Sequence, residues 1–355
     1  MNRGDADDPD GPGRRRRGGG TPLLRDLGEF GLIDLLRRRY GGAPLPGEIA
    51  IGDDAAVVRV PRGRAVLSTD MLLSGTHFSL DYFRPVEVGW RALSANLSDL
   101  AAMGASPLCY LAALAAPGDT PAATVGGIFR GMARAAASSG MRLMGGDTCR
   151  GERLVLCLTV VGALARGRPT TRAGARPGDT LFVTGAPGWS HLGLRLLRGG
   201  RPRKATGWRL EAMRRHLRPD ARWREGMAAA GSGAVAAMID LSDGVLPDLG
   251  HLLERDGLGA SLREEAFPMT PAFRRAAGVL GVDPLAAFLA GGEDYELLMA
   301  VRPGRRGGFL RAARAFPAAA TPIGEVTQEP GIRVRRTDGS VLEGSALPTG
   351  FEHFR

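Results

Sequence analysis

The stretch Asn96-Leu97-Ser98-Asp99-Leu100-Ala101-Ala102-Met103-Gly104 holds a single carboxylate among small and apolar residues. Apolar side chains such as Leu93 and Leu100 recur at helical spacing, which predicts a helix over residues 86–103. Asp99 lies on this helix, and a charged group is costly to bury unless it is paired or binds a metal. The stretch therefore predicts a buried helix that carries a functional carboxylate.

The segments on either side of this helix predict an α+β domain. Helices are expected at 23–39, 86–103 and 124–139, and strands at 55–60, 65–69, 108–115, 142–144 and 154–164. Such an order is typical of a mainly antiparallel sheet with helices packed on it. A loop rich in Arg, Gly and Pro at 166–179 then interrupts the pattern and predicts a domain boundary.

The second half of the chain predicts a mixed α/β domain. Strands are expected at 180–184, 235–239, 295–301, 321–326 and 332–335, with a helix at 245–256. A chain of 355 residues also exceeds what one hydrophobic core usually holds. We therefore expect a disordered tail at 1–20, an N-terminal domain at 21–166 and a C-terminal domain at 167–355. No apolar stretch approaches the roughly 20 residues that cross a bilayer.

Composition limits the class of protein. Lys204 is the only lysine among 47 basic residues and Arg203 precedes it, so a Gly-Lys-Ser/Thr phosphate loop is absent from the sequence. Three cysteines are too few for a disulfide framework, which indicates a reducing, cytoplasmic setting. The net charge of +10 arises largely at 191–225, where eleven basic residues outnumber three acidic ones.

The basic segment at 191–225 has two interpretations. It is typical of helices with solvated arginine faces, and the arginines concerned are Arg195, Arg198, Arg214, Arg215 and Arg222. A non-enzymatic nucleic-acid-binding protein is the alternative, although the segment holds only two tryptophans and matches no familiar nucleic-acid-binding module. We favour solvated helices.

Acidic residues recur beside glycine or serine where predicted strands begin or end. The segments are Gly52-Asp53-Asp54, Ser68-Thr69-Asp70, Gly145-Gly146-Asp147-Thr148, Asp240-Leu241-Ser242-Asp243-Gly244 and Gly291-Gly292-Glu293-Asp294. Taken singly, such aspartates are typical of helix caps and turns, and His77 of a surface histidine. Taken together with Asp99, they predict one cleft of oxygen ligands, which suits Mg²⁺ shared with nucleotide phosphates.

These segments, in this order, resemble the thiamine-monophosphate kinases. The resemblance also includes Gly75-Thr76-His77-Phe78, Glu293-Asp294-Tyr295-Glu296-Leu297 and the ending Gly350-Phe351-Glu352-His353-Phe354, and it covers residues 25 to 355. It implies a superfamily shared with aminoimidazole ribonucleotide synthetase and selenophosphate synthetase. The implied fold is an α+β N-terminal domain that dimerises through its sheet, followed by an α/β C-terminal domain.

The resemblance implies a reaction in which ATP phosphorylates thiamine monophosphate to thiamine diphosphate by direct transfer, with several Mg²⁺ ions as cofactors. It leaves a requirement for K⁺ open. The implied partners are ATP, thiamine monophosphate and a second copy of the chain, without a membrane or nucleic acid. A sister enzyme of the superfamily is the nearer alternative, but Cys109, Cys149 and Cys157 lie in or beside predicted strands, unlike the mobile-loop cysteine of a selenophosphate synthetase.

The resemblance also implies roles for individual residues. The implied Mg²⁺ ligands are Asp53, Ser68, Thr69, Asp70, Asp99, Asp147, Asp240 and Asp243, of which Asp53, Asp99 and Asp240 are the expected catalytic group. The implied ATP contacts are Phe129, Gly146, Asp147, Arg172 and Ser242, and the implied substrate contacts are His77, Glu293 and Phe351. Phe129 replaces the tyrosine usual in the family, so a hydrogen bond from that hydroxyl to ATP is lost.

Overall fold

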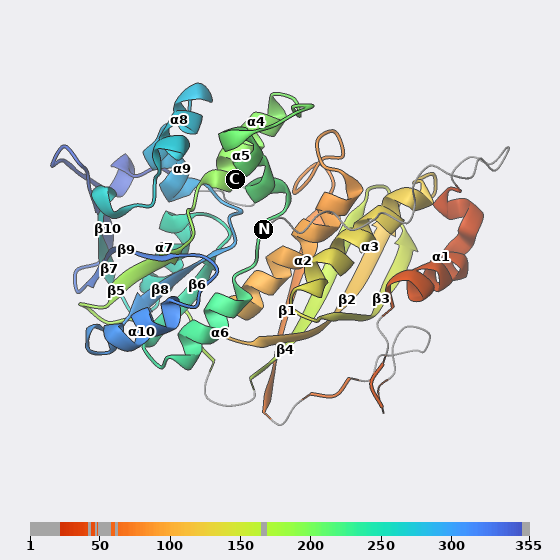
Figure 1. Cartoon of the computed structure of the whole chain (residues 1–355), viewed down its shortest axis with the longest axis horizontal. Coiled ribbons are helices and arrows are strands. Elements are labelled where there is room, and N and C mark those ends of the chain that lie inside the picture. The colour runs from red at the N-terminus through yellow and green to blue at the C-terminus, as the bar shows by residue number, and fades with distance from the viewer. Residues whose placement is uncertain are drawn as a thin grey trace, which may run out of the picture.

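The computed structural model describes residues 22–41, 44–46, 48, 58–60, 63–164 and 169–349. Two sheets organise this part of the chain, one from each half of the sequence, and Figure 1 shows them side by side with helices α2 and α6 between them. None of the helices in this described part is long and apolar enough to cross a membrane.

The N-terminal sheet has four strands in the order β1-β4-β2-β3. Its elements are β1 (Arg64–Leu73), β2 (Ser106–Ala116), β3 (Arg142–Arg150) and β4 (Val155–Leu164), with α1 (Leu24–Tyr40), α2 (Pro85–Ala102) and α3 (Ala122–Ala137). Strand β4 pairs antiparallel with β1 and β2, and only β2 and β3 are parallel. The predicted mainly antiparallel sheet is confirmed.

The helices cover one face of this sheet. Along each strand, apolar side chains that face the helices alternate with side chains of mixed polarity that face away from them, so only one face needs to be covered. Leu72, Leu156 and Leu158 point to the helices and are buried in one core with α2 and α3. The opposite face is open in this chain, where Leu67 is 65% exposed and Met71 is 55% exposed. This open face therefore exposes large apolar side chains among polar ones.

Helices α2 and α3 touch backbone to backbone at glycine. A Cβ atom built on Gly89 would lie 1.8 Å from the carbonyl oxygen of Ile128, far inside van der Waals contact. The close approach allows the backbones of α2 and α3 to pack in direct contact, which fixes the distance of α2 from the sheet. Glycine at this position therefore determines where Asp99, further along α2, is held.

The C-terminal sheet has seven strands in the order β11-β10-β7-β9-β5-β8-β6, and it mixes parallel and antiparallel pairs as predicted. Its strands are β5 (Thr180–Thr184), β6 (Val235–Leu241), β7 (Gly259–Arg263), β8 (Glu296–Val301), β9 (Ala320–Thr327), β10 (Gly331–Arg335) and β11 (Val341–Glu343). Its helices are α4 (Trp189–Arg198), α5 (Gly207–Leu217), α6 (Trp223–Gly231), α7 (Val245–Glu254), α8 (Pro271–Val279), α9 (Pro284–Ala290) and α10 (Arg306–Ala313).

Helix α2 is the element through which the two halves meet. It contacts α5, α6, β6 and β8 of the C-terminal half, and a Cβ atom on Gly226 of α6 would lie 2.1 Å from the carbonyl oxygen of Ala101. Strand β6 ends in Asp240 and Leu241, so this packing carries the end of β6 toward the Asp99 turn of α2. The contact places acidic residues of both halves in one region.

Several sequence predictions about elements are corrected. Gly145, Gly146 and Asp147 lie inside β3, whereas the sequence predicts a turn after a short strand. Residues 58–60 are not in a strand, and the rest of the expected strand at 55–60 lies outside the described residues. Strands β7 and β11 have no counterpart among the predicted strands, since both are short and poor in β-branched residues. The expected division between residues 166 and 167 lies outside the described residues, and the described part of the predicted loop, 169–179, contains no helix or strand.

Candidate active site

Ser68, Asp70 and Asp99 meet where β1 passes under α2. The Ser68 hydroxyl donates a hydrogen bond to the Asp99 carboxylate, and the backbone N–H of Asp70 donates to Oδ1 of Asn96 over 3.2 Å. Because side chains alternate along a strand, Ser68 and Asp70 share the face that looks at α2. Local strand and helix geometry thus brings three of the predicted oxygen ligands together.

Asp240 joins this group from the C-terminal half. Its side chain is 5% exposed at the end of β6. Burial, reinforced by the negative charge of Asp99, raises the pKa of Asp240 to about 7. Burial and the same neighbour raise the pKa of Asp70 to about 6. Asp70, Asp99 and Asp240, which we call the carboxylate cluster, are therefore close enough to repel one another.

Positive charge near the carboxylate cluster comes from Arg172, which opposes the rise in the pKa values of Asp99 and Asp240. Among the described residues, none of the three aspartates forms an ion pair with a basic side chain, and no group of three or more His, Cys, Asp or Glu side chains is arranged to hold a metal ion. Oxygen ligands with uncompensated charge fit Mg²⁺, which binds few protein groups and completes its shell with water and phosphate. The donors present therefore suit the predicted cofactor.

The turn after β6 is held by a residue that the sequence analysis did not select. Oδ2 of Asp248, in the first turn of α7, accepts the backbone N–H groups of Asp243 and Gly244, each over 3.1 Å. Burial raises the pKa of Asp248 to about 8. An acidic residue in the first turn of a helix is a detectable signal for such a cap. Asp248 therefore fixes the backbone of the turn that carries Ser242 and Asp243 just after β6.

The loop before β8 is also tied to this turn. The backbone N–H of Glu293 donates to the carbonyl oxygen of Ser242 over 2.6 Å, and that of Tyr295 donates to Leu241 over 2.9 Å. Glu293 and Tyr295 are the non-glycine residues with positive φ in the described chain, at 66° and 53°. Glu293 therefore presents its carboxylate from a tightly constrained turn beside the site.

His77 lies in the turn that follows β1, where its Nδ1 accepts the backbone N–H of Leu73 over 3.1 Å. This contact explains locally why the ring is held against the end of the strand. The same strand carries Ser68 and Asp70, so His77 extends the β1 side of the site toward the loop at 74–80.

Two predicted metal ligands, Thr69 and Asp147, and the predicted ATP contact Gly146 are not brought to the carboxylate cluster by this chain alone. The Thr69 hydroxyl points to the open face of the sheet, where it donates to the carbonyl oxygen of Leu158 over 2.9 Å. Gly146 and Asp147 lie on β3, and the order β1-β4-β2-β3 places them at the opposite edge from Asp70. With strands about 4.8 Å apart, that separation is about 14 Å.

A cavity of about 920 Å³ lies at this far edge, between α1 and the ends of β2 and β3. Thr148 and Arg150, close after Asp147, contribute to its lining. The ring of Phe129 is buried in the core beside it, 6.0 Å from the ring of Tyr40, so it packs rather than lines the cavity. Asp53 and Phe351 lie outside the described residues.

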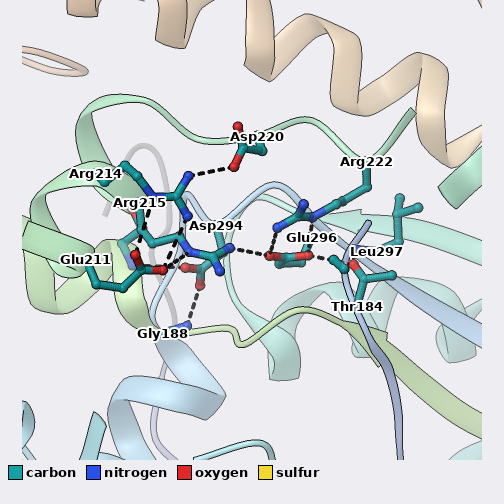
Figure 2. A network of polar contacts seen from close by, with 12 residues as sticks. Thr184, Gly188, Glu211, Arg214, Arg215, Asp220, Arg222, Asp294, Glu296 and Leu297 are labelled. Atoms are coloured by element: carbon teal, nitrogen blue, oxygen red, sulfur yellow. Dashed lines mark hydrogen bonds and ion pairs between the residues drawn. The ribbon is translucent and has the colours of Figure 1, made fainter. Parts of the chain in front are cut away.

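The expectation that the arginines of 191–225 form solvated faces is wrong for two of them. Arg222 is buried and donates two hydrogen bonds of 2.6 Å to the Glu296 carboxylate, and Arg215 donates a third of 2.9 Å. Figure 2 shows these arginines converging on Glu296 while Thr184 approaches from the other side. Arg195 and Arg198 are exposed as expected. The network anchors β8, directly after the Glu293 turn, to α5 and α6.

Asp294 anchors the other side of that turn. Its carboxylate accepts the backbone N–H groups of Gly188 and Ser190 at the start of α4, over 2.5 and 3.0 Å. Burial raises its pKa to about 7, although the N-terminus of a helix favours the charged form. The acidic residues after Glu293 therefore have structural roles that the sequence pattern did not distinguish from ligand roles.

Comparison with known proteins agrees with this architecture. Residues 52–164 match the N-terminal domain of the AIR synthase related proteins, and residues 176–337 match their C-terminal domain. A thiamine-monophosphate kinase of Mycobacterium tuberculosis is 40% identical over 281 residues, covering 78% of this chain and 82% of that protein.

Solved structures extend the similarity to three dimensions. The thiamine-monophosphate kinase of Stenotrophomonas maltophilia K279a superposes with a TM-score of 0.73 at 33% identity, covering 82% of this chain and 91% of that chain. The AaThiL structure complexed with AMPPCP and TMP has a TM-score of 0.72 at 33% identity and covers 95% of this chain and all 100% of that chain. The chain thus belongs to the AIR synthase related family and, within it, to the thiamine-monophosphate kinases.

Proposed function

We propose that this protein transfers the γ-phosphoryl group of ATP to thiamine monophosphate and so forms thiamine diphosphate. The observation that carries the proposal is the meeting of the partly buried Asp70 and Asp99 with the buried Asp240, from both halves of the chain, in a group that forms no ion pair with a basic side chain among the described residues. The AaThiL structure, which covers nearly the whole chain, contains an ATP analogue together with TMP.

The reaction brings two phosphate groups together. At about 4 Å, two unit charges repel by about 4 kcal/mol at an effective dielectric near 20, and each phosphate carries more than one charge. Mg²⁺ bound by Asp70, Asp99 and Asp240 would neutralise this charge. Arg172 would add positive charge from the C-terminal half, where it already acts on Asp99 and Asp240. A phosphate acceptor is largely deprotonated at neutral pH, so the site needs no general base.

The remaining roles follow the arrangement of elements. Asp243 and Ser242 lie in the turn that Asp248 holds, next to the end of β6. His77 lies in the turn after β1 and Glu293 in the turn before β8, so the two come from different halves of the chain and suit a substrate that spans both. Glu293 would attract the thiazolium cation. Three free cysteines are consistent with a reducing, cytoplasmic setting.

The test is to incubate the protein with thiamine monophosphate, ATP and Mg²⁺ and to measure thiamine diphosphate by chromatography. We expect product only when all three are present, and we expect EDTA to abolish turnover because the carboxylate cluster would again be uncompensated. Excess Mg²⁺ should restore it. Thiamine without a phosphate is the matched acceptor control. ADP release without thiamine diphosphate, or turnover that EDTA leaves intact, would contradict the proposal.

We further propose that the working form is a homodimer joined through the open face of the N-terminal sheet. Leu67 and Met71 are more than half exposed there, and the backbone row that contains Met71 and Cys157 ends at Asp147 on β3. Two such faces placed together would bury this apolar surface. Asp147 ends this row on the same open face and Thr69 also lies on that face, so the contact would bring both predicted ligands against the partner.

A charge on the open face tests the dimer. We expect Leu67→Asp to convert the protein to monomers, because two carboxylates would be buried across the symmetric contact, and to lower kcat at least about 10-fold. Light scattering after gel filtration gives the mass. Leu210→Asp is the control, since Leu210 is 54% exposed on α5 of the other half. A monomeric wild type, or a fully active monomeric variant, would exclude this arrangement.

A further inference from the structure

Arg91 is a fully buried arginine whose acidic partner belongs to the other half of the chain. It lies on α2, and its side chain is 1% exposed. Its guanidinium forms an ion pair with Glu293, the carboxylate in the constrained turn before β8. The Glu293 side chain remains 32% exposed. The Arg91 guanidinium is therefore buried in the protein, whereas the Glu293 carboxylate is partly exposed at the site.

The guanidinium itself is held from several directions. Nη1 of Arg91 donates a hydrogen bond of 2.6 Å to the carbonyl oxygen of His216 on α5. The guanidinium carbon lies 5.7 Å from the ring centroid of Phe83 and 5.8 Å from that of Tyr295. An arginine restrained by a backbone acceptor and two ring faces has little freedom to follow a moving partner. The carboxylate must therefore adjust to the arginine.

The Glu293 turn also needs support. Left-handed backbone is unfavourable at a non-glycine residue, and here two residues, Glu293 and Tyr295, adopt it. Two backbone hydrogen bonds to Leu241 and Ser242 hold the turn itself. Neither bond reaches the Glu293 carboxylate. In the described part of the chain, the basic side chains on that carboxylate are Arg91, in direct contact, and His216, whose Nδ1 is 3.7 Å away.

His216 is a weak charge partner. Burial and the neighbouring arginines lower its pKa well below the ordinary value, so the ring is neutral, and its Nδ1 lies 3.1 Å from the Ser190 hydroxyl. The charge that orients Glu293 therefore comes from Arg91.

We propose that Arg91 is a positioning residue that sets the affinity for thiamine monophosphate by orienting the Glu293 carboxylate. The inference rests on the proposed function and adds to it a residue of α2 that does not touch the reacting phosphates. Arg91 and Asp99 both lie on α2. The ion pair with Arg91 therefore fixes the Glu293 carboxylate, which would bind the substrate, relative to the helix whose Asp99 would bind the metal. Loss of Arg91 should weaken substrate binding more than turnover.

The test is a double-mutant cycle between Arg91→Met and Glu293→Gln, measured as KM for thiamine monophosphate, KM for ATP and kcat. We expect Arg91→Met alone to raise KM for thiamine monophosphate about 10-fold or more, with KM for ATP and kcat changed less than about 3-fold. In the Glu293→Gln background, the same change should add less than about 2-fold. Arg91→Lys should recover part of the affinity, because it restores a cation.

Arg201→Met is the matched control. Arg201 also forms a partly buried ion pair with a carboxylate of α2, Glu87, but it has no contact with Glu293. We expect its KM for thiamine monophosphate to stay within about 2-fold of wild type. Should Arg91→Met fail to give folded protein by thermal melting, the cycle is run with Arg91→Lys.

The outcomes separate this inference from the proposed function. Wild type that makes no thiamine diphosphate contradicts the function. Active wild type with fully additive Arg91 and Glu293 effects contradicts the positioning role alone, as does an equal rise in KM for ATP. A rise in KM that disappears in the Glu293→Gln background supports it, because a general structural defect would persist there.

Discussion

Asp99→Asn is expected to lower kcat by about 100-fold or more while the protein remains folded. The amide keeps the shape of the side chain and can still accept the Ser68 hydrogen bond, so packing of α2 on β1 is preserved. It removes the charge at the centre of the carboxylate cluster, which binds the divalent cations in the proposed reaction. Steady-state formation of thiamine diphosphate at several Mg²⁺ concentrations measures the effect.

The same substitution is expected to leave the metal-free protein as stable as wild type or more stable. Burial and the Asp99 charge together raise the pKa values of Asp70 and Asp240, so removing Asp99 relieves a repulsion that the folded state suffers without cations. Thermal melts in EDTA and in Mg²⁺ test this, and the gain from Mg²⁺ should shrink in the variant.

Asp34→Asn is the control for these measurements. Asp34 pairs with Arg37 and Arg38 on the exposed side of α1, and its loss should change neither kcat nor the response to Mg²⁺. Near-normal turnover of Asp99→Asn at ordinary Mg²⁺ would remove Asp99 from the metal site. A lower melting temperature in EDTA would mean that Asp99 stabilises the fold instead of straining it.

Gly89→Ala is expected to destabilise the protein by about 3 kcal/mol or more. Its Cβ would lie 1.8 Å from a backbone carbonyl of α3, and neither helix has a flexible side chain there that could give way. In an ordinary helix interior, the same change would instead stabilise by about 1 kcal/mol through helix propensity. The sign of the effect therefore reports the close approach of α2 and α3. Urea unfolding followed by circular dichroism measures it.

Gly250→Ala in α7 is the matched control, because a Cβ atom there would meet no heavy atom within 4 Å. We expect a neutral to slightly stabilising effect at this position. Equal effects of the two substitutions would contradict the helix contact. A destabilised Gly89→Ala protein that stays folded at low temperature should also lose activity, since α2 carries Asp99 and Arg91.

The N-terminal architecture is predictable because its elements are long and periodic. Helix α2, strand β4 and the apolar strand β2 all follow patterns that local physics interprets directly. The short strands β7 and β11 are not predictable in this way, because their pairing partners, rather than their own composition, hold them in the sheet.

The order of residues alone establishes the family, the two-domain plan and the acidic motifs, because glycine- and serine-flanked aspartates in a fixed order can be recognised in a sequence. The distances between these residues in the folded protein cannot be predicted from that order. Strand alternation turns Thr69 away from the cluster that Ser68 joins, and sheet order puts Asp147 on the far edge from Asp70. Arg91 and Glu293 form a pair only after the two halves pack together, and Arg222 becomes buried against Glu296 only when distant segments of the C-terminal half pack together. These outcomes depend on long-range contacts, whose partners no local pattern specifies.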